Sequence, residues 1–332
     1  MTITRPLILR MLLIAALSIL SASPVLAWDA LGHRLSAYLA YDQMNEAQRR
    51  FWVSTLQGHP RYQQDFVTAM PAEIAAQGAI AQARWQFGQA AVWPDIARGF
   101  RGLDERFHFP DRHWIDGAWV REDVEMQGNI YIDMEPLPDI QGPQDQQITR
   151  EYQADNVLTG LVYARRVLVT NSDPEERAIA LCWLLHLGGD IHQPLHAGAL
   201  YSPGVFPDGD RGGNGIAVDT TNLHAMWDGA LRGVSLQRNL SELRDIQRSL
   251  REHEFAFTPG TWLLESRELL HAAVYPDAVI SAIRRSERTG NQLDSIETSD
   301  SYRDGMRTMA LQRIAEAGQR LLGTLNELHG QP

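Results

Sequence analysis

Two histidine and aspartate pairs share the same four-residue spacing. His186 and Asp190 stand in LLHLGGDIHQPLH, and His224 and Asp228 stand in TNLHAMWDGAL. On a helix, residues four apart leave the same face with Cβ atoms about 5 to 6 Å apart. Zinc prefers imidazole nitrogen and carboxylate oxygen ligands, and a catalytic zinc ion often keeps one position open for water. The spacing therefore indicates zinc chemistry.

A further histidine follows the first pair. Pro194 ends the predicted helix, so His196 is delivered from the next turn. A lone histidine on an apolar helix is often a core residue, and one such pair is often only an exposed helix pair. Together, however, five imidazoles and carboxylates on apolar segments would be costly to bury without coordination or hydrogen bonds. They exceed what one four-coordinate ion needs.

The motifs HLGGDIHQPLH, DRGGN and TNLHAMWD, in this order, resemble the signature of the single-strand-specific, trinuclear-zinc nuclease family of the mung bean nuclease type. Its sister group is the bacterial zinc phospholipase C. In that superfamily the mature protein begins with a tryptophan whose α-amine and carbonyl bind zinc, and WDALGH matches this with Trp28 and His33. VWPDIAR and RHWID match the family's next two motifs and give Asp95 and His113.

The resemblance implies three zinc ions. Asp190 would bridge two of them, since paired catalytic metals commonly lie about 3.5 to 4 Å apart. The implied ligands are Asp95, His113, His186 and Asp190 for the first ion, His196, His224 and Asp228 for the second, and Trp28, His33 and Asp190 for the third.

The same matching assigns two catalytic residues that bind no metal. Asp116 would orient the attacking water, and Arg98 would stabilise negative charge in the transition state. An ordinary surface salt bridge is the alternative interpretation of Arg98. Two further residues are candidate substrate contacts: Trp114 could stack on a nucleobase or pack in the core, and Asn214 in GGN could be a polar contact or part of a simple turn.

Two other histidines compete for a place in the site. His108 could replace His113, but only His113 is followed by WID, so we expect His108 in an outer or structural position. His192 lies two residues past Asp190 and points off the shared helix face, so at best it orients a ligand.

The first 27 residues read as a secretory signal peptide. Arg5 and Arg10 precede the apolar run MLLIAALSIL and the small-residue stretch SASPVLA, and the natural cleavage site follows Ala27. No segment reaches the roughly 20 apolar residues that span a bilayer. We therefore expect a secreted or periplasmic product from Trp28, without stable membrane association and monomeric.

Charge constrains how such a protein could bind a polyanion. Loss of Arg5 and Arg10 takes the formal net charge from −11 to about −13, and none of the 30 basic residues is a lysine or stands in a long basic run. Nonspecific nucleic-acid binders usually carry basic stripes. Metal ions would therefore have to supply the attraction for a phosphate ester.

The elements that must position these residues are mainly helical. Apolar residues recur at helical spacing over 34–56, 150–171, 174–191, 261–274 and 302–328. Residues 93–147 and 201–215 are irregular, with NIYIDM the one candidate strand. The lone cysteine, Cys182, is expected to be a buried small side chain. We predict a single-domain multi-helix bundle over residues 28–332, with long loops around a trinuclear zinc cleft.

The family resemblance implies a zinc-dependent hydrolase that cuts single-stranded DNA and RNA to products ending in 5'-phosphate and acts as a 3'-nucleotidase on 3'-mononucleotides. A zinc phospholipase C is one alternative, although that branch has glutamate at the position of Asp228. An exported, noncatalytic zinc-binding protein is another. The presence of Asp116 and Arg98, which bind no metal in this scheme, argues against it.

Overall fold

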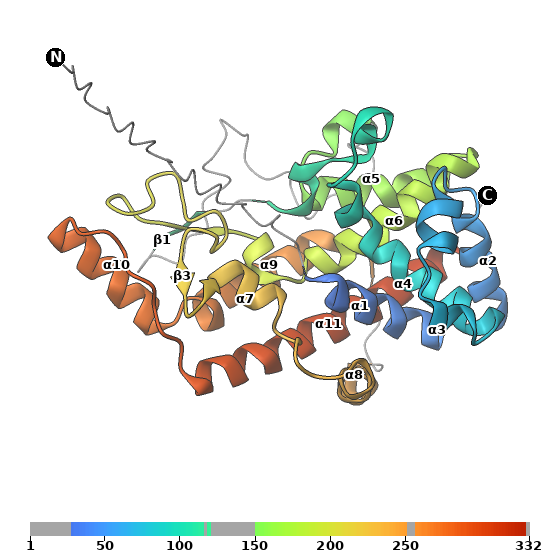
Figure 1. Cartoon of the computed structure of the whole chain (residues 1–332). Coiled ribbons are helices and arrows are strands. Elements are labelled where there is room, and N and C mark those ends of the chain that lie inside the picture. Colours follow the sequence, from blue (N-terminus) through green and yellow to red (C-terminus); the bar gives the residue numbers. More distant parts are fainter. Residues whose placement is uncertain (1–27, 116–117, 121–149, 251–255, 330–332) are drawn as a thin grey trace, which may run out of the picture.

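The computed structural model describes residues 28–115, 118–120, 150–250 and 256–329. The chain forms one mainly helical domain, as predicted (Figure 1). Its α-helices are α1 (Ala30–Gln43), α2 (Glu46–Leu56), α3 (Ala72–Ala75), α4 (Ala79–Ala97), α5 (Val157–Thr170), α6 (Pro174–Asp190), α7 (Leu223–Asp228), α8 (Leu236–Leu250), α9 (Pro259–Leu269), α10 (Asp277–Thr289) and α11 (Asp300–Leu328).

Short tight turns and strands join the helices around the predicted site. The 3₁₀ turns are η2 (Gly102–Phe107), η3 (Pro110–His113), η5 (Glu151–Gln153) and η6 (Pro194–His196), and η1 (Gln63–Thr68) and η7 (Leu270–Val274) are π-helical. Strand β1 (Ala118–Val120) pairs in parallel with β2 (Ala199–Tyr201), with Ala118 opposite Ala199. Strand β3 (Ala217–Val218) pairs antiparallel with β4 (Thr221–Asn222).

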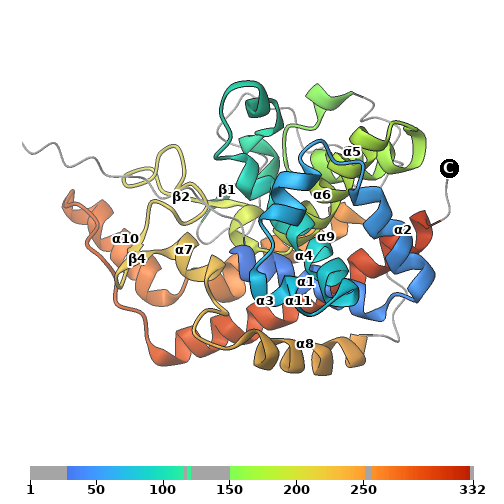
Figure 2. The same ribbon diagram turned by 45° about the vertical axis from the view of Figure 1, so that its right-hand side comes forward.

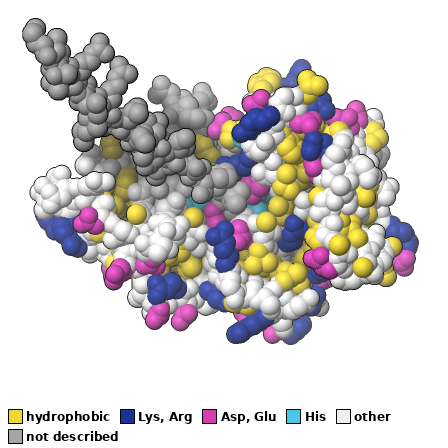
Figure 3. Space-filling view, in the orientation of Figure 1, with side chains coloured by type: hydrophobic (Ala, Val, Ile, Leu, Met, Phe, Trp, Pro, Cys, Tyr) yellow, Lys and Arg dark blue, Asp and Glu magenta, His cyan; other side chains and the backbone are white. Residues whose placement is uncertain are grey.

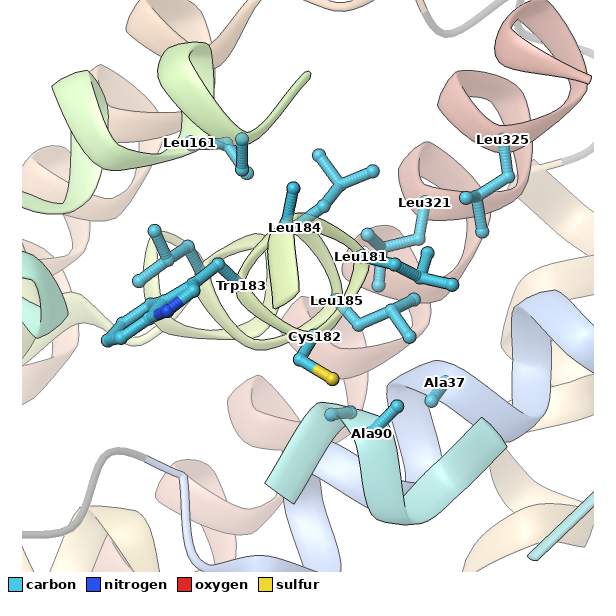
Figure 4. Packing of buried hydrophobic residues seen from close by; sticks show 14 of the residues in the cluster. Ala37, Ala90, Leu161, Leu181, Cys182, Trp183, Leu184, Leu185, Leu321 and Leu325 are labelled. Carbon is cyan, nitrogen blue, oxygen red and sulfur yellow. The ribbon is translucent and has the colours of Figure 1, made fainter. Parts of the chain in front are cut away.

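Helix α6 lies at the centre of the larger core. It packs against α4, α5 and α11, and its LCWLL segment is buried on all sides (Figure 4). Each fully buried leucine there stabilises the fold by about 1.5 to 3 kcal/mol. Cys182 is completely buried, as predicted, and burial raises the pKa of its thiol well above the usual value. The end of α6 that carries His186 and Asp190 thus follows directly on a fully buried segment.

A second apolar cluster is formed by side chains of α1, α8, α11 and their neighbours. Helix α1 lies along α11 and α4, and α8 covers the outer side of α1 and α11 (Figure 2). Trp28 and Trp227 are both buried in this cluster. The segment just before α1 is also tied to α7, because the Asp29 N–H donates to the carbonyl of Asp228, the last residue of α7.

The prediction of one helix over 34–56 was wrong. Met44 has an extended backbone, and Asn45 then caps α2. The Asn45 side chain accepts a hydrogen bond from the Gln48 amide at 3.0 Å, and the Gln48 side chain accepts one from the Asn45 amide at 2.9 Å. This capping box starts a new helix where apolar spacing alone suggests continuity.

The start of the irregular region was also predicted too early. Helix α4 runs through Trp93 and Pro94 to Ala97, so Asp95 lies on a helix rather than in a loop. A proline inside a helix costs about 3 kcal/mol. Here the surrounding turn is buried, and the Trp93 indole donates a hydrogen bond to Asp65 at 2.8 Å. Packing of this turn outweighs the local penalty.

The helices predicted over 174–191, 261–274 and 302–328 are confirmed within about two residues, as α6, α9 with η7, and α11. The helix predicted over 150–171 was started too early, because the 3₁₀ turn η5 comes first and α5 begins only at Val157. Helices α4, α8 and α10 were not predicted. Within the described residues, no helix combines the length and the apolar character needed to cross a membrane. The predicted leader (1–27), Asp116 and the NIYIDM segment (129–134) lie outside the described residues.

Candidate metal centre

The predicted side-chain ligands converge from six elements that are distant in the sequence. His33 comes from α1, Asp95 from α4, His113 from η3 and His196 from η6. The pair His186 and Asp190 comes from the last turns of α6, and the pair His224 and Asp228 from α7. All are buried, and Asp95 is the most exposed of them at 9%.

The four ligands implied for the first ion lie together. The Asp190 Oδ2 atom is 3.1 Å from His186 Nε2 and 3.3 Å from His113 Nδ1. The Asp95 Oδ1 atom lies 3.9 Å from each of the same two nitrogens. His113, His186 and Asp190 thus form a group that could hold a metal ion.

Asp190 presents its second oxygen to a different histidine. Its Oδ1 atom lies 3.3 Å from His33 Nε2, while Oδ2 faces His186 and His113. The His33 and His186 rings stack with centroids 4.0 Å apart. His33, Asp95 and His186 also lie close enough to share a metal ion. Asp190 therefore has the geometry of a bridging carboxylate.

The ligands implied for the second ion form a separate group. His224 Nε2 lies 3.2 Å from His196 Nε2 and 3.3 Å from Asp228 Oδ2. These three residues could hold a metal ion of their own. Trp28 is buried beside them, because the next amide, Asp29 N–H, donates to the Asp228 carbonyl at 3.2 Å.

The chemistry of these groups fits zinc. Ligands of one tetrahedral zinc lie about 3.3 Å apart when each bond is about 2.0 Å, which matches the 3.1 to 3.3 Å separations in both groups. Both Asp190 oxygens, Asp95 Oδ2 and His33 Nε2 are buried without a hydrogen-bond partner among the described residues. Unpartnered buried polar atoms are costly, and metal ions would satisfy them.

Backbone carbonyls fix the tautomers of three histidines. The Nδ1 atoms of His186, His196 and His224 lie 2.7, 2.5 and 2.6 Å from the carbonyls of Ala91, His113 and Gly212. When Nδ1–H donates to a carbonyl, Nε2 keeps its lone pair for a metal. Each of these Nε2 atoms faces its ligand group.

Burial favours the neutral imidazoles that metal binding requires. It lowers the pKa of His113 to about 4 and that of His224 to about 3. Burial also raises the pKa of Asp228 well above its usual range. For Asp190, burial is outweighed by His186 and the other histidines, which lower its pKa well below the usual value.

Two residues that support the site, Gln193 and Gly189, were not predicted from the sequence. The buried Gln193 amide donates to Asp228 Oδ1 at 2.7 Å, and its oxygen accepts from the Leu195 amide at 2.6 Å. A Cβ atom at Gly189 would lie 2.8 Å from His33 Nδ1, so only glycine lets that ring approach α6 so closely. Both residues stand inside the HLGGDIHQPLH motif, where a polar or glycine position amid apolar neighbours was the available signal.

A cavity of about 620 Å³ opens above the histidines. His113, His196 and His224 line it, together with Arg98 and Trp114, both assigned from the sequence. In the space-filling view, the visible histidine atoms lie near the middle of the face beside acidic side chains (Figure 3). Trp114 is partly exposed rather than a packed core residue.

Arg98 and Asn214 both line this cavity, and each also contacts a residue three positions away in the sequence. The Arg98 guanidinium is 3.4 Å from Asp95 Oδ1, and its side chain is 16% exposed, so its ion pair is at the site rather than on the open surface. The Asn214 amide donates to the Arg211 carbonyl at 2.8 Å, which closes the turn.

The two competing histidines lie outside the ligand groups. His108 is partly exposed on the segment after η2, and among the residues that the structure describes it belongs to none of the groups that could hold a metal. The buried His192 ring faces Gly188 O and accepts from Arg320 at 2.8 Å. It joins the end of α6 to α11, a contact that was not predicted, and within the described residues it belongs to none of the candidate ligand groups.

The sequence model of the S1/P1 nuclease family matches residues 28–330, almost all of the chain outside the predicted leader. The chain belongs to the S1/P1 nuclease family. The resemblance inferred from the short motifs is thereby confirmed.

Individual S1/P1 relatives are distant. Nuclease S1 of Aspergillus oryzae (strain ATCC 42149 / RIB 40) is 28% identical over 50% of this chain and 60% of its own length. Endonuclease 3 of Arabidopsis thaliana is 28% identical over 54% of this chain and 64% of its own length. Endonuclease 1 of the same plant is 24% identical over 96% of this chain and 93% of its own length. The chain thus spans less than two thirds of the first two relatives.

Proposed function

We propose that the protein is a zinc-dependent phosphodiesterase that cuts single-stranded DNA and RNA to 5'-phosphate products and removes phosphate from 3'-mononucleotides. One observation carries the proposal: buried histidine and aspartate groups with unpartnered atoms lie beneath a cavity that also holds Arg98 and Trp114. Membership of the S1/P1 nuclease family supports nucleic acid as the substrate.

Three zinc ions would occupy the ligand sets inferred from the sequence, with the Trp28 amine and carbonyl completing the third. Bound there, zinc would polarise phosphate oxygens and lower the pKa of water. The family match begins at Trp28, which supports cleavage after Ala27 and therefore a free amine at that position. Export to the periplasm or the medium is part of this proposal.

The protein's own side chains would bind and orient the substrate. Arg98 lies beside Asp95 at the cavity wall, where its cation can neutralise charge that develops on phosphate oxygens. Trp114 offers a partly exposed ring on which a base can stack, an interaction that tolerates any base. Asp116 would orient the attacking water, as the family motif implies. A cavity of this size admits an unpaired nucleotide more readily than a stiff duplex.

The proposal is tested by hydrolysis assays on the chain that begins at Trp28. Single-stranded DNA, RNA, a 3'-mononucleotide and phosphatidylcholine are compared before chelation, after chelation and after zinc is restored. We expect zinc-dependent cleavage of the nucleic acids and loss of activity in an Asp116→Asn variant. Cleavage of the lipid alone would instead indicate a phospholipase C, and stoichiometric zinc without any hydrolysis would indicate a noncatalytic zinc protein.

A further inference from the structure

Arg211 lines the same cavity as Arg98 but comes from a different element. It stands in the loop between β2 and β3, whereas Arg98 ends α4. The histidines His113, His196 and His224 line the cavity between these elements. The cavity thus carries one arginine near the proposed scissile phosphate and a second arginine that the metal chemistry does not use.

The backbone at Arg211 is unusual. Its φ angle is +57°, and Gly212 and Gly213 follow with φ angles of +58° and +83°. Glycine adopts this left-handed region freely, but a residue with a side chain does so at a cost in free energy. Such a conformation persists when the surroundings over-determine it, and it is frequent at ligand sites. A guanidinium at this position therefore calls for a functional explanation.

Hydrogen bonds hold this loop from both sides of Arg211. The buried Asp210 carboxylate accepts from the Leu200 amide at 2.9 Å and from the Tyr275 hydroxyl at 3.0 Å. The Asn214 side chain donates to the Arg211 carbonyl at 2.8 Å. The next carbonyl, that of Gly212, orients His224. These bonds therefore hold the backbone at Arg211 in a fixed position relative to His224 before any ligand binds.

The charge of the molecule limits what this cation can do. The whole chain has a net charge of −11, so a polyanion gains little from the surface at large. Asp208 also lines the cavity, and the Arg211 guanidinium offers donors in a planar fork that matches phosphate. A single strand carries a phosphate at every nucleotide, so one phosphate at the histidines brings its neighbours close to the cavity walls.

We propose that Arg211 binds a second phosphate of the substrate strand, adjacent to the phosphate at the metal centre. This inference rests on the proposed nuclease function and makes the cavity select strands over substrates with one phosphate. Arg211 acts here as a specificity-determining residue, whereas Arg98 serves the reacting phosphate.

The test uses trinucleotides in which the bond to be cut is constant and its neighbour is either a phosphate or an uncharged methylphosphonate. The neighbour is placed on the 5' side in one pair of substrates and on the 3' side in another. We expect wild-type kcat/KM to be about tenfold higher or more with a charged neighbour on one side. Arg211→Gln abolishes that preference and leaves kcat/KM on the methylphosphonate substrate unchanged.

Salt dependence gives a second readout. For a single-stranded oligonucleotide, loss of one phosphate contact reduces the slope of log KM against log salt by about 0.7. We expect this smaller slope for Arg211→Gln and an intermediate slope for Arg211→Lys, which keeps the charge. The slope should be unchanged in Arg50→Gln, which removes an equal charge from an exposed site on α2. Arg211→Gly, which adopts the left-handed backbone without cost, should behave as Arg211→Gln and so excludes a collapsed loop.

Three results overturn the inference. The first is a charged-neighbour preference that survives in Arg211→Gln. The second is an equal loss of kcat/KM on both members of each substrate pair, and the third is a changed base preference with an unchanged salt slope, because either means that Arg211 does not bind phosphate. Failure of the wild-type protein to cut any trinucleotide is a different outcome, seen before variants are compared, and it rejects the proposed function together with this inference.

Discussion

Gln193 orients a proposed metal ligand through two short hydrogen bonds. Its amide N–H holds Asp228 Oδ1, which leaves Oδ2 toward His224, and its amide oxygen holds the Leu195 amide at the start of η6. Groups that orient a metal ligand typically contribute about 10- to 100-fold to metal affinity. Gln193 is a positioning residue in this sense.

We predict that Gln193→Met, which conserves volume, weakens zinc binding at the His196, His224 and Asp228 group by about 10- to 100-fold. Competition with a chromogenic chelator measures the affinity. Gln247→Met is the control, because Gln247 is also buried but donates to Leu39 O, away from the site. Equal zinc affinity in Gln193→Met and the wild type would show that Asp228 needs no such support.

The proposed role of the Trp28 amine gives a second prediction about a single residue. If the Trp28 amine is a ligand, one extra alanine ahead of Trp28 replaces the amine with an amide. We expect zinc content to fall from about three to about two ions per chain in the proposed scheme, while the fold is kept because α1 starts at its own cap, Asp29. Elemental analysis of both forms gives the answer, and an unchanged zinc content contradicts the assignment of Trp28.

Helices α6, α9 and α11 are joined by a charged cluster behind the metal centre. Glu265 on α9 accepts two hydrogen bonds from Arg320 at 2.7 Å each and one from Arg313 at 2.9 Å. Both arginines are buried on α11 and also contact His192 at the end of α6. The cluster therefore holds the carboxyl end of α6, which carries the ligands, against α11.

Removal of the Glu265 charge should destabilise this junction. Breaking a buried ion pair costs about 3 to 5 kcal/mol, and since the Glu265 side chain is 34% exposed we expect about 2 kcal/mol for Glu265→Gln. Urea denaturation measures the free energy of unfolding. Glu46→Gln, from an exposed pair with Arg50, should change it by less than about 0.5 kcal/mol. Equal effects of the two variants would contradict the argument.

The same carboxylate predicts a pH dependence. Burial alone would raise the pKa of Glu265, but Arg320 and Arg313 outweigh burial and lower it from the usual 4.5. A depressed pKa in the folded state means that the stabilisation is complete above about pH 4.5 and is lost as pH falls through the lower, folded value. The stability difference between wild type and Glu265→Gln should therefore shrink below pH 4.5. A constant difference down to pH 3 would contradict it.

Elements with strong apolar spacing could be predicted, whereas their ends and their partners could not. Helix α6 and its His186 and Asp190 pair follow from a three-and-four repeat. The capping box at Asn45 and the burial of Pro94 within α4 depend on tertiary contacts that such a repeat does not encode. The meeting of His33 with Asp190 was accessible only through the family motifs, because spacing along one helix says nothing about another.

In the domain as a whole, the candidate metal centre lies between the two apolar clusters. The candidate ligands come from α7 in one cluster, from α4 and α6 in the other, and from α1, which has residues in both. Without metal, the buried carboxylates and imidazoles have unpartnered atoms in the middle of the domain. Stability should therefore depend on zinc as much as activity does.

Removal of zinc is predicted to lower the thermal midpoint. Binding to the folded state alone stabilises by about 4 kcal/mol when free ligand is a thousandfold above Kd. We expect calorimetry to show a lower Tm after chelation and recovery when zinc is added. Asp228→Asn should reduce the size of the shift. A Tm that is indifferent to chelator would mean that the buried groups are satisfied without metal.

The proposed function requires that the buried histidine and aspartate groups form a zinc centre that cleaves nucleic acid. The most direct test is zinc content and single-stranded DNA hydrolysis measured on the same preparation of the chain from Trp28 during stepwise chelation. We expect about three zinc ions per chain, with hydrolysis falling as they are removed and returning as they are restored. Full hydrolysis by a zinc-free protein would contradict it.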